Sequence, residues 1–289
     1  MKALVIGASG QVGHQLMEHL AKQGHEGVGT YSEHPVPGLL HLDLRSHSEA
    51  EARIREARPN LILCAAGMTH VDRCETEPDL ARAVNTEGPL ACARAADAIG
   101  AKFVYFSTEY VFDGYHGPYS EDEPIHPLSV YGQSKAEAEE ALRRDHPKAL
   151  IVRTTVVYGV DPQGKNFVYQ LLTRGKKREP MRAPDDQISS PTYNEDLAAA
   201  TLRLAVMDAS GIFHVVGPDI MDRYAFSRVV CDVFGLDSSL LSAIKTSDLK
   251  QKAPRPLKAG LRNDKLIRLT SYSPLGVREG LEAMKKRLT

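Results

Sequence analysis

The sequence predicts an α/β protein: a doubly wound parallel sheet with helices on both faces, joined to a smaller, interleaved C-terminal domain. Two observations predict this class. Short apolar runs alternate with longer amphipathic segments through the first half of the chain, and a glycine-rich turn directly follows the first apolar run. Strands that alternate with helices form right-handed βαβ units, in which the strands run parallel.

The expected strands are short apolar runs between turn signals, at residues 3–6, 27–31, 61–65, 103–107 and 150–153. The expected helices carry apolar residues at helical spacing, at residues 12–23, 81–99, 134–144, 194–206, 223–234 and 277–285. After about Gly159 turn signals become frequent and the pattern is mixed. We therefore expect a first domain over residues 1–160. Residues 161–289 should form mainly a second domain, with segments that return to the sheet.

Composition and charge exclude several classes of function. The chain has 36 Lys and Arg against 37 Asp and Glu, so no basic surface for nucleic acid is expected. Its four cysteines form no CxxC pair and its histidines are scattered, so we expect buried free thiols and no metal site. With no signal peptide pattern and no apolar stretch of membrane-spanning length, we expect a cytoplasmic protein without a membrane partner.

A glycine-rich turn, Gly7-Ala8-Ser9-Gly10-Gln11-Val12-Gly13, follows the first expected strand. Gly7 permits a tight turn, Gly10 lets the backbone approach a pyrophosphate, and Gly13 lets the helix lie close to the strand. The free N–H groups at the start of that helix then face the phosphates. The turn predicts dinucleotide binding in a Rossmann-like domain. The residues assigned to the cofactor here are Gly7, Ser9, Gly10, Gln11, Val12 and Gly13.

The end of the second strand bears on the choice between NADPH and NADH. An acidic residue there would bind the ribose hydroxyls and repel a 2′-phosphate. Here the chain reads Gly29-Thr30-Tyr31-Ser32, and the first acid is Glu33. Thr30 and Ser32 can donate hydrogen bonds to a phosphate, although no arginine lies beside them in the sequence. The sequence favours NADPH and leaves NADH open.

A tyrosine and a lysine one helical turn apart, Tyr131 and Lys135, form a candidate catalytic pair. A free tyrosine has a pKa of roughly 10, and a nearby ammonium is expected to lower it toward the working range. Upstream, Thr108 ends an apolar strand at the sheet edge where such folds bind ligands. Its hydroxyl is expected to hydrogen-bond a substrate carbonyl and the phenol of Tyr131. Together these residues predict the reduction of a carbonyl group.

These motifs also carry a resemblance. The GxxGxxG turn resembles that of the extended short-chain dehydrogenase/reductase superfamily. The run Ser-Thr-Glu-Tyr-Val-Phe-Asp-Gly at residues 107–114, followed by Tyr131-Gly-x-x-Lys135, resembles the dTDP-4-dehydrorhamnose reductase family. Further matching residues, as far as Arg255-Pro256, extend the likeness over nearly the whole chain. Glu109 replaces the usual aspartate of this family, and Cys64 replaces an asparagine.

The resemblance implies an NAD(P)H-dependent oxidoreductase that reduces the 4-keto group of a nucleotide-diphosphate deoxysugar, in dTDP-rhamnose and polysaccharide synthesis. It assigns catalysis to Thr108, Tyr131 and Lys135. The further cofactor residues are expected to be Thr30, Asp43, Leu44, Ala65, Ala66 and Gly67, together with Tyr131 and Lys135, whose ammonium can also hold the nicotinamide ribose. The residues expected near the substrate are Thr69, Glu109, Tyr110, Asn166 and Arg255. Two of these assignments have structural alternatives: Asp43 as a solvated loop aspartate, and Arg255 as a partner in an ion pair.

Two other functions stay open at this point. The family that this chain resembles also includes a regulatory subunit of methionine adenosyltransferase, in which a dinucleotide would stabilise a protein interface. The presence of all three of Thr108, Tyr131 and Lys135 argues against that function. The other alternative is a nucleotide-sugar epimerase or dehydratase that retains its NAD. A homodimer is compatible with the sequence, which does not identify the sugar or the nucleotide.

Overall fold

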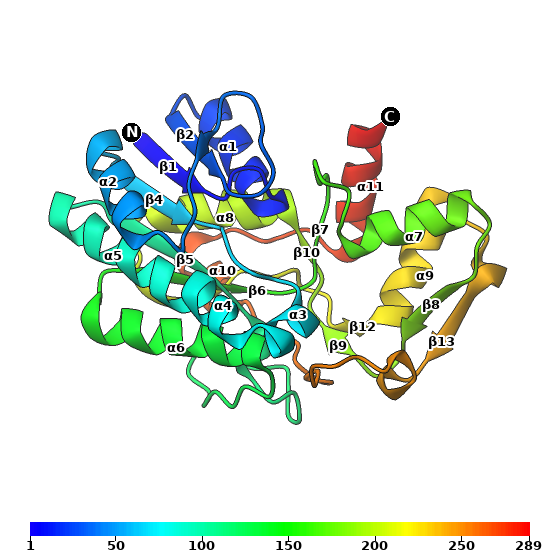
Figure 1. Ribbon diagram of the computed structural model, residues 1–289. Coiled ribbons are helices and arrows are strands. Elements are labelled where there is room, and N and C mark those ends of the chain that lie inside the picture. Colours follow the sequence, from blue (N-terminus) through cyan, green and yellow to red (C-terminus); the bar gives the residue numbers. More distant parts are fainter.

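The computed structural model describes residues 1–289 and confirms the α/β class (Figure 1). A seven-stranded sheet has the order β11-β6-β5-β4-β1-β2-β3, and every neighbouring pair is parallel. From β1 the chain first adds strands on one side and then on the other, so the sheet is doubly wound with its switch point between β1 and β4. The strands are β1 (Lys2–Ile6), β2 (Glu26–Tyr31), β3 (Leu40–His41), β4 (Leu61–Cys64), β5 (Lys102–Thr108), β6 (Leu150–Thr154) and β11 (Gly211–His214).

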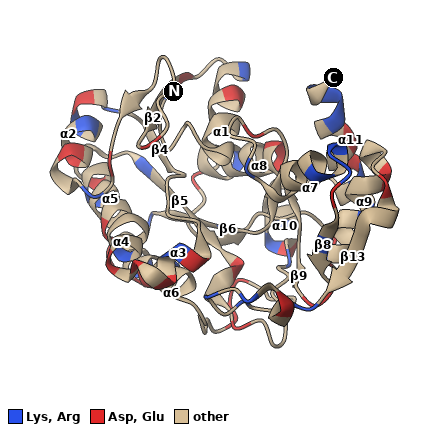
Figure 2. Ribbon diagram, turned by 45° about the vertical axis from the view of Figure 1, so that its right-hand side comes forward, with Lys and Arg blue, Asp and Glu red and all other residues tan.

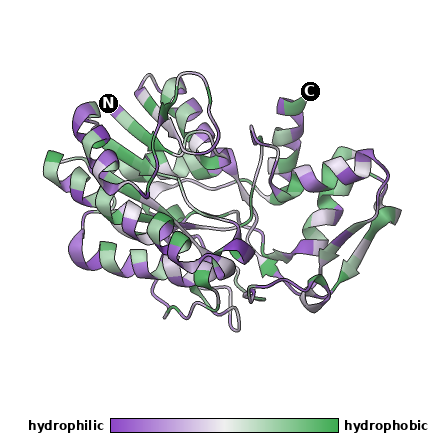
Figure 3. Ribbon diagram, viewed as in Figure 1, coloured by the Kyte–Doolittle hydropathy of each residue, from purple (hydrophilic) through white to green (hydrophobic).

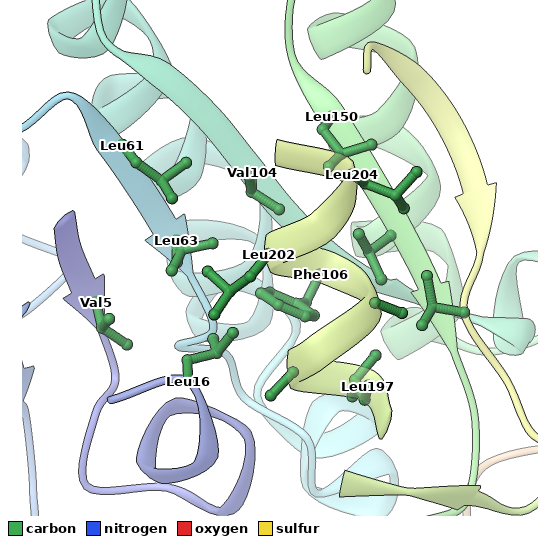
Figure 4. Packing of buried hydrophobic residues seen from close by; sticks show 14 of the residues in the cluster. Val5, Leu16, Leu61, Leu63, Val104, Phe106, Leu150, Leu197, Leu202 and Leu204 are labelled. Carbon is green, nitrogen blue, oxygen red and sulfur yellow. The ribbon is translucent and has the colours of Figure 1, made fainter. Parts of the chain in front are cut away.

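Helices cover both faces of this sheet because successive strand residues point to opposite sides. Ala3 and Val5 of β1 belong to one core, with α1 (Gln11–Lys22), α8 (Asn194–Val206) and α10 (Asp264–Thr270). Leu4 and Ile6 belong to the core on the opposite face, with α2 (His47–Ala57), α5 (Gly88–Ile99) and α6 (Val130–Asp145). Figure 4 shows Leu16 of α1 and Leu202 of α8 against the first face. The hydrophobic strands between the helices are visible in Figure 3.

A further core lies beside the sheet, on the right of Figure 1. It joins α7 (Phe167–Lys176), α9 (Arg223–Phe234) and α11 (Val277–Leu288) with the paired strands β8 (Met181–Pro184) and β13 (Leu241–Ile244). Two small strand pairs complete this part: β7 (Val157–Tyr158) with β10 (Thr192–Tyr193), and β9 (Ile188–Ser189) with β12 (Met221–Asp222). Between these elements in sequence, α8 and β11 belong to the seven-stranded sheet and its cover.

The structure differs from the expected elements at several places. The helix predicted over residues 81–99 consists of α4 (Pro78–Arg82), a π-helical turn (Ala83–Glu87) and α5. Helix α6 begins four residues earlier than predicted, because the side chain of Ser129 caps it by accepting a hydrogen bond from Gly132 N at 3.2 Å. The sequence analysis did not predict α2, which buries only Ala50 and Ile54 and therefore has a weak apolar stripe.

Charged residues of both signs are interspersed along the outer helices (Figure 2). None of the helices combines the length and apolar character that crossing a membrane requires. All four cysteines are free and buried, which confirms the expectation for the thiols. No group of three or more His, Cys, Asp or Glu side chains is placed to hold a metal ion.

One ion pair is an exception to this surface distribution of charge. Arg153 of β6 and Glu139 of α6 are 2% and 1% exposed, and Arg153 Nη2 lies 2.6 Å from Glu139 Oε2. Arg153 Nε donates to Glu139 Oε1 at 2.9 Å, so the contact is bidentate. The guanidinium also lies 5.0 Å from the centre of the Phe112 ring. The pair ties α6 to the sheet, because either charge alone would be buried without compensation.

We therefore expect Glu139→Gln to lower the free energy of unfolding by about 3 kcal/mol or more, since it leaves the Arg153 charge unpaired. Glu140→Gln is the matched control: Glu140 is the next residue of the same helix and is exposed, so the change should be within about 0.5 kcal/mol. Urea denaturation of the two variants measures both values. Equal stability of the two variants would contradict a tethering role for the buried pair.

Candidate active site

A cavity of about 1170 Å³ runs along the carboxyl ends of the central strands. Its lining includes Gly7 after β1, Ala65 after β4, and Thr108 and Thr154 at the ends of β5 and β6. Residues from the second half of the chain, such as Arg223, close the other side. The cavity therefore lies at the switch point of the sheet, where folds of this class bind ligands.

The glycine turn fits a pyrophosphate. Gly7 has φ +87°, and a Cβ there would lie 2.8 Å from the backbone of Ala66. A Cβ on Gly13 would lie 2.2 Å from Gly7 O, so only glycine lets α1 approach β1 this closely. At Gly10 the nearest protein atom to an added Cβ is 3.5 Å away, and this residue lines the cavity. The first N–H groups of α1 have no partner within the helix and can bind an anion.

The other expected cofactor residues lie around this turn, with one exception. Ala65, Ala66 and Gly67 line the cavity, as do Asp43 and Leu44. The Arg45 side chain donates to Asp43, with Nε 2.7 Å from Oδ2, and this hydrogen bond is the main cause that lowers the pKa of Asp43.

The exception is Thr30, for which the sequence analysis expected a direct contact with the cofactor. It is 1% exposed and does not line the cavity. Its Oγ1 accepts a hydrogen bond from Gly7 N at 3.2 Å. Thr30 therefore stabilises the glycine turn from the protein interior.

Thr108, Tyr131 and Lys135 line the same cavity and are 6%, 9% and 4% exposed. Lys135 Nζ donates to the carbonyl oxygen of Phe106 at 3.0 Å and lies 4.7 Å from the centre of the Tyr105 ring. Burial lowers the pKa of Lys135 to about 8. The α6 face and the end of β5 thus bring the three side chains together.

The phenol of Tyr131 behaves differently from the sequence expectation. Its pKa is raised, chiefly by burial, while a hydrogen bond with the Thr108 side chain lowers it. Burial disfavours the charged phenolate, and this effect sets the direction of the shift. Tyr131 therefore holds its proton at neutral pH, which is the state that a proton donor requires.

Asn85 is a structural residue of the site to which the sequence analysis gave no role. It lies in the π-helical turn, and such turns often occur at functional sites. Its Oδ1 accepts from Met68 N at 2.8 Å, and its Nδ2 donates to Ser134 Oγ at 3.1 Å. Asn85 thereby holds the loop after β4 against α6, close to Lys135.

The residues expected near the substrate all line the cavity: Thr69, Glu109, Tyr110, Asn166 and Arg255. Two of them are engaged by the protein itself. Asn166 caps α7, since its Oδ1 accepts from Val168 N at 3.1 Å. Arg255 Nη2 lies 2.9 Å from Asp72 Oδ1, so the ion pair that was the structural alternative for this residue is present.

Glu109 and Arg223 lie at this end of the cavity, and the charge of each acts on the pKa of the other. Glu109 is 4% exposed: its Oε1 accepts from Ser189 Oγ at 3.2 Å, and its Oε2 has no hydrogen-bond partner. Burial raises its pKa to about 7. Arg223 makes no salt bridge, and its guanidinium lies 5.0 Å from the centre of the Phe167 ring. Burial lowers its pKa. Nothing in the spacing of the sequence indicated Arg223.

Known proteins resemble this chain along its whole length. The family model described as RmlD substrate binding domain matches residues 1–289. A dTDP-4-dehydrorhamnose reductase from Salmonella typhimurium is 33% identical over 288 residues, which cover 93% of this chain and 91% of that protein. The spore coat polysaccharide biosynthesis protein SpsK of Bacillus subtilis is 34% identical over 256 residues, or 88% of this chain and 87% of that protein.

Solved structures show the same similarity. A dTDP-4-dehydrorhamnose reductase from Clostridium acetobutylicum has a TM-score of 0.91 at 32% identity and covers 100% of this chain and 99% of its own. One from Bacillus anthracis, in complex with NADP, has a TM-score of 0.90 at 30% identity and covers 99% of both chains. A UDP-glucose 4-epimerase from Thermotoga maritima, with a TM-score of 0.86 at 20% identity and full coverage of both chains, shares the fold alone. The resemblance inferred from the motifs is confirmed: the chain belongs to the dTDP-4-dehydrorhamnose reductase family of the extended short-chain dehydrogenases/reductases.

Proposed function

We propose that this protein is an NADPH-dependent reductase that converts the 4-keto group of a dTDP-linked deoxysugar, dTDP-4-dehydrorhamnose, to an alcohol. The observation that carries the proposal is that Thr108, Tyr131 and Lys135 line one cavity with the glycine turn. The names of the relatives and the NADP in one related structure support the substrate and the cofactor. NADH is the alternative reductant.

The bound dinucleotide supplies the hydride, and the residues of this chain supply the proton and the orientation. Tyr131 donates its phenolic proton to the oxygen that becomes the alcohol. The Thr108 hydroxyl hydrogen-bonds the same oxygen and fixes its position beside the phenol. Lys135, held by the carbonyl of Phe106, keeps a positive charge in the cavity that offsets negative charge left on Tyr131.

The other end of the cavity suits a nucleotide diphosphate and a sugar. Arg223 lines the cavity and makes no salt bridge, and a guanidinium can bind phosphate oxygens bidentately. Arg255 lines the same space while it is paired with Asp72. The free Oε2 of Glu109 is available for a sugar hydroxyl. We propose that the substrate enters between the two expected domains, residues 1–160 and 161–289.

The cofactor content of the purified protein and its turnover of NADPH distinguish the reductase from the alternative functions. A reductase consumes NADPH in proportion to the ketone added. An epimerase or dehydratase retains and regenerates NAD, and a regulatory subunit does not oxidise NADPH at all. The cytoplasmic location, the homodimer and the absence of a nucleic-acid partner stay predictions from the sequence.

Tyr131→Phe should lower kcat at least about 100-fold, because it removes the proton donor. The affinity for NADPH should change little. The assay follows the loss of NADPH absorbance with dTDP-4-dehydrorhamnose. Tyr115→Phe is the control, since Tyr115 is 66% exposed and lies outside the cavity. Turnover within threefold of the wild type in the Tyr131 variant would refute the proposed role.

Two substitutions in the glycine turn should differ in their effects on cofactor binding and on thermal stability. Gly10→Ala adds a methyl group that the protein can accommodate but that enters the pyrophosphate space. It should weaken NADP⁺ binding by about tenfold or more, roughly 1.4 kcal/mol, at unchanged thermal stability. Gly13→Ala should lower thermal stability as well, because its Cβ meets Gly7 O. Calorimetric titration and thermal unfolding measure the two effects. If Gly10→Ala binds NADP⁺ normally, the pyrophosphate does not lie over this turn.

The buried carboxyl of Glu109 should make stability depend on pH. Its pKa is about 7 in the folded protein against an ordinary 4.5, so the folded state holds the proton more tightly. The free energy of unfolding should therefore fall as the pH rises from about 4.5 through about 7, by roughly 3 kcal/mol in all. Glu109→Gln should remove this dependence, and Glu282→Gln, at an exposed position, should keep it. Urea denaturation between pH 5 and pH 8 provides the comparison, and identical pH profiles for both variants would contradict it.

A further inference from the structure

We propose that Lys165 and His34 bind the 2′-phosphate of NADPH and give this protein its preference for NADPH over NADH. The inference rests on the proposed function, since it concerns the same dinucleotide site. It answers a question that the sequence left open, because none of the residues directly after β2 is an arginine.

The position of the pair is the first argument. Ser32, Glu33 and His34 follow β2 and line the cavity. In folds of this class, the end of the second strand faces the adenosine ribose. Lys165 also lines the cavity, and its Nζ lies 2.9 Å from His34 Nε2. An ammonium from a segment 131 positions further along the chain therefore reaches the ribose end of the site.

The loop that carries Lys165 is held in place by its own hydrogen bonds. Asp161 is 7% exposed, and its carboxylate accepts from the backbone N–H groups of Gln163 at 2.9 Å and Lys165 at 2.8 Å. Gln163 Nε2 donates to Ser9 O at 2.9 Å and so pins the loop to the glycine turn. Two residues of chain span at most about 7 Å. The backbone of Lys165 therefore stays close to the turn that fits the pyrophosphate.

The local charges point to an anionic ligand. Neither Lys165 nor His34 makes a salt bridge with a carboxylate, although the two basic side chains touch. Glu33 is the nearest acid in sequence, and its charge acts on Arg45 and Arg73. The pKa of Arg45 is raised chiefly by Asp43 and less by Glu33, and that of Arg73 chiefly by Glu77 and less by Glu33.

Lys165 and His34 are therefore basic side chains beside the end of β2 that have no carboxylate within salt-bridge distance. A phosphate dianion has the charge and the acceptor oxygens to bind both side chains at once. The ribose of NADH has only a hydroxyl at this position, so its interaction with the two basic side chains would be much weaker. The geometry thus favours NADPH.

The test is equilibrium binding measured by calorimetric titration, with NADP⁺, NAD⁺, 2′,5′-ADP and 5′-AMP as probes. Lys165→Ala should weaken the binding of NADP⁺ and of 2′,5′-ADP by about tenfold or more, as expected for the loss of one charge-assisted contact. Binding of NAD⁺ and 5′-AMP should stay within about twofold. His34→Ala should act in the same direction with a smaller effect, and Lys165→Arg should keep most of the preference.

Lys177→Ala is the matched control, because it removes the same charge from an exposed lysine outside the cavity. If Lys165→Ala weakens the binding of NADP⁺ and NAD⁺ equally, the loop contributes to the binding of the whole dinucleotide and not to recognition of the 2′-phosphate. This result would overturn the proposal. Unchanged binding of NADP⁺ overturns it too. If the wild-type protein binds neither dinucleotide, the proposed cofactor site fails and this inference fails with it, which the wild-type titration alone reveals.

Discussion

The site depends on how a buried ammonium is held. Lys135 is almost completely buried, and its hydrogen bond to Phe106 O joins α6 to β5 at the edge of the sheet. Four residues further along the same helix, Glu139 pairs with Arg153 of β6, and four residues earlier Tyr131 faces the cavity. One helical face thus carries the anchor, the charge and the proton donor. Because burying a charge without partners is costly, the position of α6 on the strand ends is tightly constrained.

The two sides of the cavity have separate tasks that follow from their local structure. The glycine turn and the loop after β4 offer backbone groups and small residues, so they suit a dinucleotide that needs close approach. The side built by the second half of the chain offers Arg223 and Arg255, which suit phosphate groups. Thr108 and Tyr131 lie on the sheet side, in the same cavity. This division explains how one sheet edge can hold a reductant and a charged sugar substrate together.

The sequence predicted what is local and missed what depends on packing. The glycine turn and the Tyr131–Lys135 pair each lie within a few residues, so their spacing alone determines the geometry. The raised pKa of Tyr131 could not be predicted, because burial depends on elements far away in the chain. Thr30 is buried and bonds to Gly7 instead of lining the cavity, which the sequence pattern of this strand did not indicate. Lys165 contacts His34 through a loop that is held by hydrogen bonds to Asp161, and this contact spans 131 positions of the chain.

The central claim is that a hydride enters the sugar while the chain supplies the proton. The most direct measurement uses NADPH carrying deuterium at the transferred position, with dTDP-4-dehydrorhamnose in ordinary water and analysis of the product by NMR and mass spectrometry. The account predicts one deuterium on C4 of the sugar for each NADPH oxidised. A product without deuterium, or a sugar transformed while the cofactor stays unchanged, would contradict it.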